Sequence, residues 1–180
     1  EDCSQSHGAK WKGSYVGTFG DIAAFSTMYR KAHITGASGG VIYTKNLDLY
    51  RQGLAHADRG KMPWVDGFDE RNPSQFLFPA LNLHTDEISC AIGIASLKRL
   101  PNIIEKRCRF VTKVSGRLKE ISTICQPQPC SENDSPFVYP IWVDGTKIEC
   151  TKQKFAEAVR AEGIGLNPHY EYLVANWAYL

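Results

Sequence analysis

The sequence lacks several patterns that identify common classes of protein. No run approaches the roughly 20 apolar residues that a membrane-spanning helix needs, and no signal peptide is visible. Lys and Arg number 21 against 19 Asp and Glu, so the net charge of +2 does not favour nucleic acid as a partner. The chain has neither internal repeats nor low-complexity segments. We therefore expect 180 residues to form one globular domain with a small appendage, without a nucleic-acid or membrane partner.

The six cysteines form no recognisable metal or disulfide pattern. They include no C-x-x-C pair and no histidine at ligand spacing, which argues against a structural zinc site. Their wide spread is also unlike that of a small disulfide scaffold. We expect reduced thiols in a cytoplasmic protein, although Cys125 and Cys130 are close enough in sequence to be bridged in an oxidising environment.

Short apolar runs bounded by glycines characterise the first third of the chain. Residues Ile22–Ser26 and 41–44 each form such a run and predict buried strands of an α/β sheet. The segment 27–38 between them is then a loop near a strand end. After a cap at Asn46, a helix is predicted by apolar residues at helical spacing, namely Leu47, Tyr50 and Leu54. Residues 60–79 are rich in Pro, Gly and Asp and predict a long loop, which is usually functional in a compact domain.

From Asp86 onward the apolar period is helical. Ile88 and Ile92 share one face with Ala95, and Pro101, a favourable first-turn residue, predicts the start of a second helix. The second helix would place its apolar residues inward: Ile104, Cys108, Val111 and Leu118. Its basic residues would form a solvated face: Lys106, Arg107, Arg109, Lys113, Arg117 and Lys119.

The last third begins with a boundary. Residues 126–136 are rich in Pro, Ser and Asn, and 137–143 then predicts a strand. Thr151 caps a further predicted helix, which Gly163 ends. A linker followed by a strand and a helix suggests a small α+β appendage.

Five blocks of this sequence stand in an order and spacing typical of a known enzyme family. They are EDCSQSHGA, GTFGDIAAFS, a lysine five residues after that serine, TGASGG and LNLHTDEISCAIGIASLKRL. Together they resemble the DegT/DnrJ/EryC1/StrS family, the pyridoxal-phosphate sugar aminotransferases of fold type I. The resemblance implies that residues 1–121, with an interface loop at 60–85, are part of a cofactor-binding large domain built on a mixed sheet flanked by helices. It implies that residues 126–180 are an incomplete small α+β carboxy-terminal domain.

The same resemblance implies roles for five residues around pyridoxal 5'-phosphate. Asp2 would keep the ring nitrogen protonated, which the cofactor needs to act as an electron sink, and Gln5 would pack over the ring. Ser26 would bind the phosphate, and Lys31 would form the Schiff base and later move the proton as general acid and base. Asn82 would reach the cofactor phosphate of the partner chain in a homodimer with shared sites.

The lysine loop departs from the family pattern in its length. Counted forward from Ser26, Lys31 stands at the Schiff-base position. Counted backward from Gly39 and Gly40, the loop is one residue longer than usual, and Ala32 stands there instead. The two counts leave the position open between Lys31 and Ala32.

Two histidines are weaker candidates for substrate contacts. Some relatives carry a histidine in place of the lysine and remove a sugar 3-hydroxyl group instead of transaminating. His33 lies near that position, but neither count places it there. His7 is an isolated histidine, which is more often a structural residue.

Three functions from different classes therefore stay open. The first is an aminotransferase that moves an amino group from an amino acid, glutamate by resemblance, to a keto sugar that is usually nucleotide-linked. The second is a sugar 3-dehydratase with the same cofactor, and the third is a non-catalytic binding or structural subunit. The family's phosphate-cradling helix would lie upstream of Glu1 and its closing helical segment beyond Leu180. We expect either part of a longer enzyme or a truncated relative.

Overall fold

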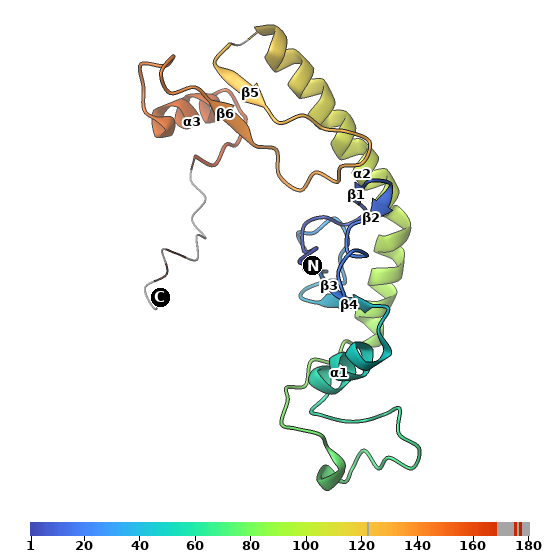
Figure 1. Ribbon diagram of the computed structural model, residues 1–180. Helices are drawn as coiled ribbons and strands as arrows, with labels where there is room; N and C mark the ends of the chain where they lie inside the picture. The colour runs from blue at the N-terminus through green and yellow to red at the C-terminus, as the bar shows by residue number, and fades with distance from the viewer. Residues whose placement is uncertain (122, 169–174, 176, 178–180) are drawn as a thin grey trace. The chain divides into compact units, whose positions relative to one another are not determined.

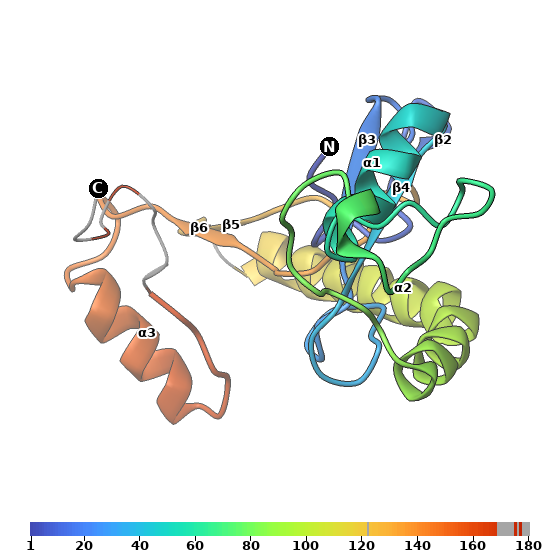
Figure 2. The same cartoon turned by 90° about the horizontal axis from the view of Figure 1, so that it is seen from below.

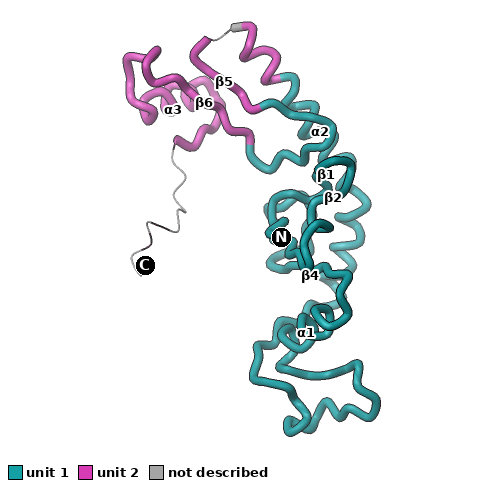
Figure 3. The backbone as a smooth tube through the Cα atoms, in the orientation of Figure 1, with its two compact units in different colours: residues 1–113, 129–138 teal, residues 114–128, 139–180 magenta. Residues whose placement is uncertain are grey.

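The computed structural model describes residues 1–121, 123–168, 175 and 177. The chain forms two compact units, one of residues 1–113 and 129–138 and the other of residues 114–128 and 139–180 (Figure 3). The first unit contains every residue for which the sequence predicts a role at the cofactor site. The expected division into domains at 121–126 stays a prediction, and the end of the chain at Leu180 lies outside the described residues.

The predicted strands of the first third are present as β3 (Ile22–Ser26) and β4 (Gly40–Thr44). They pair antiparallel, with Ser26 opposite Gly40. The first residues of the chain run parallel to β3, since the Cys3 amide donates to the Ala24 carbonyl at 2.8 Å and the Ala24 amide to Glu1. This arrangement places the EDC segment beside the strand that leads into the lysine loop. A small hairpin of β1 (Lys10–Trp11) and β2 (Ser14–Tyr15) lies between them in sequence.

The prediction that both strands are buried is wrong. In β4, Ile42 is 57% exposed and Val41 48% exposed, and in β3 only Ala23 is buried. Apolar and β-branched residues favour a strand, whereas burial depends on which elements pack against it. This chain leaves most of the β4 surface uncovered.

The helix α1 (Leu47–Ala57) confirms the predicted capped helix. The Asn46 side chain accepts hydrogen bonds from the amides of Asp48 and Leu49, which satisfies two of the donors that a helix start leaves unpaired. The segment after it is the predicted long loop, interrupted by the short 3-10 helix η1 (Pro73–Gln75).

One long helix, α2 (Glu87–Ile121), replaces the two helices expected on either side of Pro101 (Figure 1). The predicted start at Pro101 is wrong, because α2 continues through this proline although it removes one hydrogen bond from the helix interior. Here α2 packs on both sides of Pro101. Ser96 contacts the lysine loop, and Ile104 occupies the space that a Cβ on Gly8 would need, 2.5 Å from its Cδ1.

The buried face of α2 differs from the one that its isoleucines suggest. Ile88 is 74% exposed, whereas Gly93, Ser96, Val111 and Ser115 are buried. Small and polar residues therefore occupy the inner face of the first half of the helix. None of the helices in the described part of the chain is long and apolar enough to cross a membrane.

The second unit contains β5 (Cys125–Pro127), β6 (Ile141–Val143) and α3 (Lys152–Ala161). The two strands are antiparallel and lie side by side in both views (Figures 1 and 2). The predicted strand 137–143 is shortened to its last three residues, since Pro140 cannot donate to a ladder. The predicted helix is confirmed, with the Thr151 hydroxyl accepting from the Lys154 amide and Gly163 following its end.

All six cysteines are free thiols. Cys130 lies beside Cys108 of α2, whose thiol donates to the Asp134 carbonyl at 3.3 Å. Burial, together with the contact to Cys108, raises the pKa of Cys130 to about 12. The bridge between Cys125 and Cys130 that an oxidising environment would allow stays a prediction.

Candidate active site

Asp2 is held beside β3 with its carboxylate ionised. Its Oδ1 accepts a hydrogen bond from the Ser4 amide at 2.9 Å. Hydrogen bonds from the Ser4 hydroxyl and amide lower the pKa of Asp2 below its ordinary 3.8, and the nearby charge of Lys31 lowers it further. A carboxylate that stays ionised can hold a proton on a ring nitrogen opposite it.

The loop that carries Lys31 continues the β3–β4 hairpin and is closed by its own hydrogen bonds. The Thr27 amide donates to Gly39 at 2.8 Å, the Thr35 amide donates to Thr27 at 3.0 Å, and the hydroxyls of Thr27 and Thr35 lie 2.8 Å apart. Within this frame the Lys31 amide donates to Met28 at 2.9 Å. The Lys31 ammonium lies over the Phe137 ring, 4.8 Å from its centroid.

The structure distinguishes the two candidate positions in this loop. Ala32 is buried, at 6% exposure, and Lys31 is half-buried. The charge of Lys31 contributes to lowering the pKa of both Asp2 and His7. Position 31 thus carries a half-buried amine and position 32 a buried methyl group, and the assignment of the Schiff base to Lys31 stays a prediction.

Ser26 and Gln5, the two other residues with predicted cofactor contacts in this part of the chain, differ in burial. Ser26 ends β3, is half-buried, and its hydroxyl accepts from the Met28 amide at 3.4 Å. Its backbone carbonyl interacts with the His7 ring. Gln5 is exposed, three residues after Asp2, where its amide is accessible to a ligand.

His7 is buried and contacts two other rings. It is 5% exposed, and its ring centroid lies 5.8 Å from that of Phe25 and 6.1 Å from that of His33. Burial lowers the pKa of His7 below its ordinary 6.5, and the charges of His33, Lys31 and Arg107 lower it further. Its Nε2 is buried without a hydrogen-bond partner among the described residues.

Arg107 is a member of this group that the sequence patterns place in solvent. It is half-buried, its Nη1 donates to the Pro136 carbonyl at 3.3 Å, and its charge acts on His7. The spacing contained a signal, since Arg107 is three residues after Ile104 and four before Val111 on the buried face of α2. Because Arg107 lies within a run of basic residues, the sequence predicted a solvated face for it.

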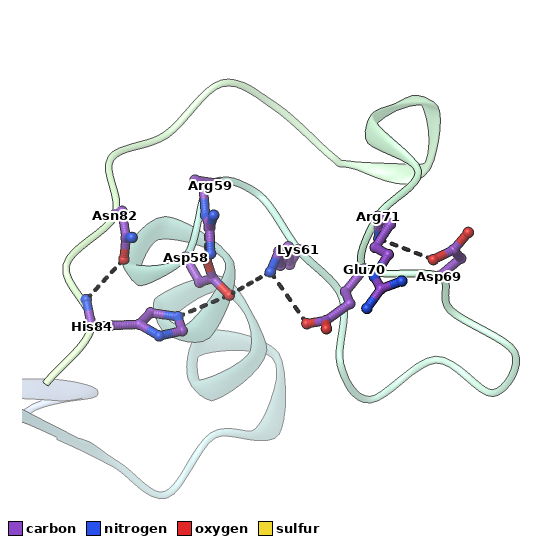
Figure 4. Close-up of polar contacts among 8 residues, drawn as sticks. All are labelled: Asp58, Arg59, Lys61, Asp69, Glu70, Arg71, Asn82 and His84. Atoms are coloured by element: carbon purple, nitrogen blue, oxygen red, sulfur yellow. Dashed lines mark hydrogen bonds and ion pairs between the residues drawn. The ribbon is translucent and has the colours of Figure 1, made fainter. Parts of the chain in front are cut away.

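Asn82 lies outside this group, at the base of the long loop. It pairs with Asp58 by an isolated antiparallel bridge, and its Oδ1 accepts from the His84 amide at 3.2 Å (Figure 4). On either side of that bridge, the Arg59 amide donates to Leu81 and the Leu83 amide donates to Ala57. These bonds fix the loop ends together and present Asn82 on the exposed side.

A charged cluster beside Asn82 stabilises the base of the loop. Asp58 bonds Arg59 at 2.7 Å, His84 at 2.9 Å and Lys61 at 3.4 Å, and Lys61 also pairs with Glu70 (Figure 4). Burial opposes ionisation of Asp58, but the bonds from Arg59 and His84 overcome it and lower its pKa. A cavity of about 580 Å³ opens beside this cluster, lined by Asp58, Lys61, Trp64, Phe68 and Glu70 among others. These ion pairs give the cluster a structural role.

The residues around Lys31 fit pyridoxal phosphate by their chemistry. An ionised carboxylate, a hydroxyl and a primary amine lie in one unit, next to a buried imidazole nitrogen that lacks a partner. The amine can form a covalent link to a carbonyl, the carboxylate suits a protonated ring nitrogen and the hydroxyl suits a phosphate. Lys31, Asp2 and Ser26 are therefore the residues that would hold this cofactor. Among the described residues, no three His, Cys, Asp or Glu side chains gather to bind a metal ion.

Comparison with known proteins decides the family. The model of the DegT/DnrJ/EryC1/StrS aminotransferase family matches residues 1–179. The chain belongs to this family. The family resemblance of the sequence blocks is thus confirmed. The relatives of this chain include a transaminase and a 3-dehydratase.

Two relatives and one solved structure define the similarity. A GDP-4-keto-6-deoxy-D-mannose 3-dehydratase of Escherichia coli is 35% identical over 93% of this chain and 45% of its own. A UDP-4-amino-4,6-dideoxy-N-acetyl-beta-L-altrosamine transaminase of Campylobacter jejuni is 27% identical over 95% of this chain and 44% of its own. A DegT DnrJ EryC1 StrS aminotransferase from Brucella abortus has the same fold, with a TM-score of 0.80 and 20% identity over 99% of this chain and 44% of that chain. The chain thus has the fold of part of this aminotransferase and spans about half the length of the relatives it matches.

Proposed function

We propose that this chain supplies the catalytic lysine of a pyridoxal-phosphate-dependent aminotransferase. The enzyme would move an amino group from an amino acid, with glutamate as the expected donor, to a keto sugar that is usually nucleotide-linked. The observation that carries the proposal is that one compact unit contains the Lys31 amine and the Asp2 carboxylate, and that the charge of Lys31 contributes to lowering the pKa of Asp2. The transaminases among its relatives support it.

Each residue of the group has a task in this reaction. The bound cofactor supplies an electron sink for the carbon that loses its proton. Asp2 would keep the ring nitrogen protonated, and Ser26 would bind the phosphate at the end of β3. Lys31 would hold the cofactor covalently, and its amine would move the proton as general acid and base. Gln5, three residues after Asp2, would pack over the ring.

The site would be shared in a homodimer, with Asn82 reaching the phosphate of the partner chain. The aromatic residues of the loop do not carry this argument, because they pack within the chain: Phe68 lies 6.1 Å from Phe76, and Phe78 lies 4.5 Å from His56. Three leucines of the same loop are exposed instead, at 52%, 71% and 64%: Leu77, Leu81 and Leu83. Exposed leucines on both sides of Asn82 suit the apolar core of an interface.

A 3-dehydratase with the same cofactor is the second candidate. The 35% identity to the Escherichia coli 3-dehydratase favours it, and His33 lies in the lysine loop. Lys31 favours the transaminase, since a dehydratase of the histidine type has no amine there. The free thiols are consistent with action in the cytoplasm, where we expect either enzyme to work.

A visible absorption spectrum with added pyridoxal phosphate tests the proposal. The intact protein should give a new band that Lys31→Ala abolishes, and with glutamate and a keto sugar it should release 2-oxoglutarate and an amino sugar. Loss of the 3-hydroxyl group from the sugar, without an amino sugar, would favour the dehydratase. A protein that gives no band at all would be the non-catalytic relative.

A further inference from the structure

The long helix α2 carries two buried serines, and each one binds a different part of the chain. Ser115, 6% exposed, lies 2.8 Å from the Tyr139 hydroxyl and 3.3 Å from the Gln128 carbonyl in the second unit. Ser96, 8% exposed, lies in the first unit and contacts two consecutive residues of the lysine loop. Its Oγ is 3.0 Å from the Ile34 amide and 3.3 Å from Nδ1 of His33.

We expect one tautomer of His33 from these bonds. The Ile34 amide can only donate, so the Ser96 oxygen accepts that bond, and the Ser96 proton is available for Nδ1 of His33. Burial lowers the pKa of His33 below its ordinary 6.5, which keeps the ring neutral at pH 7. A neutral ring that accepts at Nδ1 carries its proton on Nε2.

The lysine loop approaches α2 closely at two glycines, one in the helix and one in the loop. Three residues before it, Gly93 has no side chain, and a Cβ there would stand 3.1 Å from Cγ2 of Thr35 and 4.0 Å from Cε1 of His33. On the loop, a Cβ on Gly36 would meet Ile92 at 3.2 Å. The close approach therefore needs a glycine on each side, and it brings the loop backbone within hydrogen-bond distance of a helix side chain.

These contacts attach the lysine loop to α2 at residues that follow Lys31 in the sequence. The Thr27 and Thr35 pair closes the loop at its base, and Ser96 attaches residues 33 and 34 to α2. Lys31 is two residues before His33, and its amide is fixed on Met28. The bonds from Ser96 of α2 thus fix the chain two and three residues after Lys31.

We propose that Ser96 is a positioning residue for Lys31, acting through His33 and Ile34. The role assigned to Lys31 rests on the proposed function, whereas the attachment of the loop to α2 does not. Removing the Ser96 hydroxyl should leave the Ile34 amide and Nδ1 of His33 without their partner in a buried place, and the lysine loop should open more often. Ser96 itself touches neither cofactor nor substrate in this proposal.

The test compares Ser96→Ala with Ser115→Ala in the intact protein. Both remove a buried hydroxyl from the same helix, but only the first touches the lysine loop. Hydrogen exchange of the Ile34 amide should become about tenfold faster in Ser96→Ala, the size expected for one lost buried hydrogen bond, and stay unchanged in Ser115→Ala. Nitrogen NMR should show the Nε2–H tautomer of His33 in the wild type and a mixture of tautomers in Ser96→Ala. Ser96→Thr, which keeps the hydroxyl, should restore both.

Two reactions report on Lys31 itself. Acetylation of Lys31 by a small amine reagent, followed by peptide mapping, should be several-fold faster in Ser96→Ala, because the half-buried amine is released. Reductive trapping of pyridoxal phosphate on Lys31 should be about tenfold slower, because the amine is less often in place. Unchanged Ile34 exchange and Lys31 acetylation in Ser96→Ala, or equal changes in Ser115→Ala, would overturn the proposal. If pyridoxal phosphate reacts with no variant, including the wild type, the proposed function fails, and exchange and acetylation still decide the role of Ser96.

Discussion

The Lys31 ammonium lies 4.8 Å from the centroid of the Phe137 ring, although the two residues come from segments far apart in sequence. Phe137 lies in the segment 129–138, which belongs to the same compact unit as the lysine loop. Two further bonds hold this segment there, from the Lys10 amide to Asn133 and from Arg107 to Pro136. A stretch whose composition is typical of a linker thus forms part of the site's surroundings.

Protonation of His7 should destabilise the fold. Because burial lowers the pKa of His7 below 6.5, the unfolded chain takes up a proton at a higher pH than the folded chain does. The free energy of unfolding should therefore be highest above pH 6.5 and fall as the pH drops below it. Urea unfolding at several pH values should show this decline, and His7→Gln should reduce it. His56→Gln, a change at an exposed histidine, is the control. An NMR titration midpoint for His7 at or above 6.5 would refute the argument.

Gly60→Ala should open the base of the long loop. Gly60 has φ +82°, and a Cβ there would stand 2.1 Å from the Phe78 carbonyl oxygen, a backbone atom that cannot move aside cheaply. Gly67 has a similar φ of +72° with open space around it. Gly67→Ala therefore introduces backbone strain without a steric clash. We expect Gly60→Ala to lower the free energy of unfolding by about 2 kcal/mol more than Gly67→Ala does. Equal effects in urea unfolding would show that the loop base tolerates the clash.

Individual strands and helix starts were largely predictable from the sequence, because they depend on residues that are neighbours in the chain. Ile22–Ser26 was predicted to the residue, and the caps at Asn46 and Thr151 were found, since capping depends on neighbouring amides alone. The continuity of α2 through Pro101 was not predictable in this way, because it depends on contacts of α2 with distant segments.

The candidate site was predictable only where a sequence block marks it. Asp2, Ser26 and Lys31 stand in such blocks, and the charge of Lys31 contributes to lowering the pKa of Asp2. Arg107 was missed because the basic run around it indicated a solvated face, despite its spacing from Ile104 and Val111. Ser96 was missed because a serine among apolar residues carries no signal until its partners are known. The burial of Ser96 follows from the glycine beside it and from a loop that approaches from a different part of the chain.

Asp2→Asn should separate cofactor binding from catalysis. An amide cannot keep the ring nitrogen protonated, but it leaves Ser26 and Lys31 in place. We expect the intact protein to retain its cofactor and to lose about 10²–10³-fold in the rate of transamination, the usual effect of removing one electrostatic contact to a developing charge. The absorption of the bound cofactor and single-turnover rates with glutamate measure the two effects. A rate within a factor of two of the wild type would exclude this role for Asp2.

Mixed dimers should reveal whether the sites are shared. In a dimer of an Asn82→Ala chain with a Lys31→Ala chain, one site receives Lys31 from the first and Asn82 from the second and is intact. Each variant alone should be inactive or nearly so, and an equal mixture after subunit exchange should recover about a quarter of the wild-type activity, because half of the dimers are mixed and each has one working site. Mixed dimers that form and stay inactive would show that Asn82 acts within its own chain.

Borohydride reduction of the intact protein with pyridoxal phosphate, followed by peptide mapping, tests the central claim most directly. If Lys31 is the residue that holds the cofactor, the reduced pyridoxyl group should be recovered on the peptide that contains Lys31, and Lys31→Ala should lose it. Lys45, on the exposed side of the hairpin, and Lys61, paired with Asp58 and Glu70, are the comparison residues within the same unit. Recovery of the label on either of them, or on no lysine, would contradict the account.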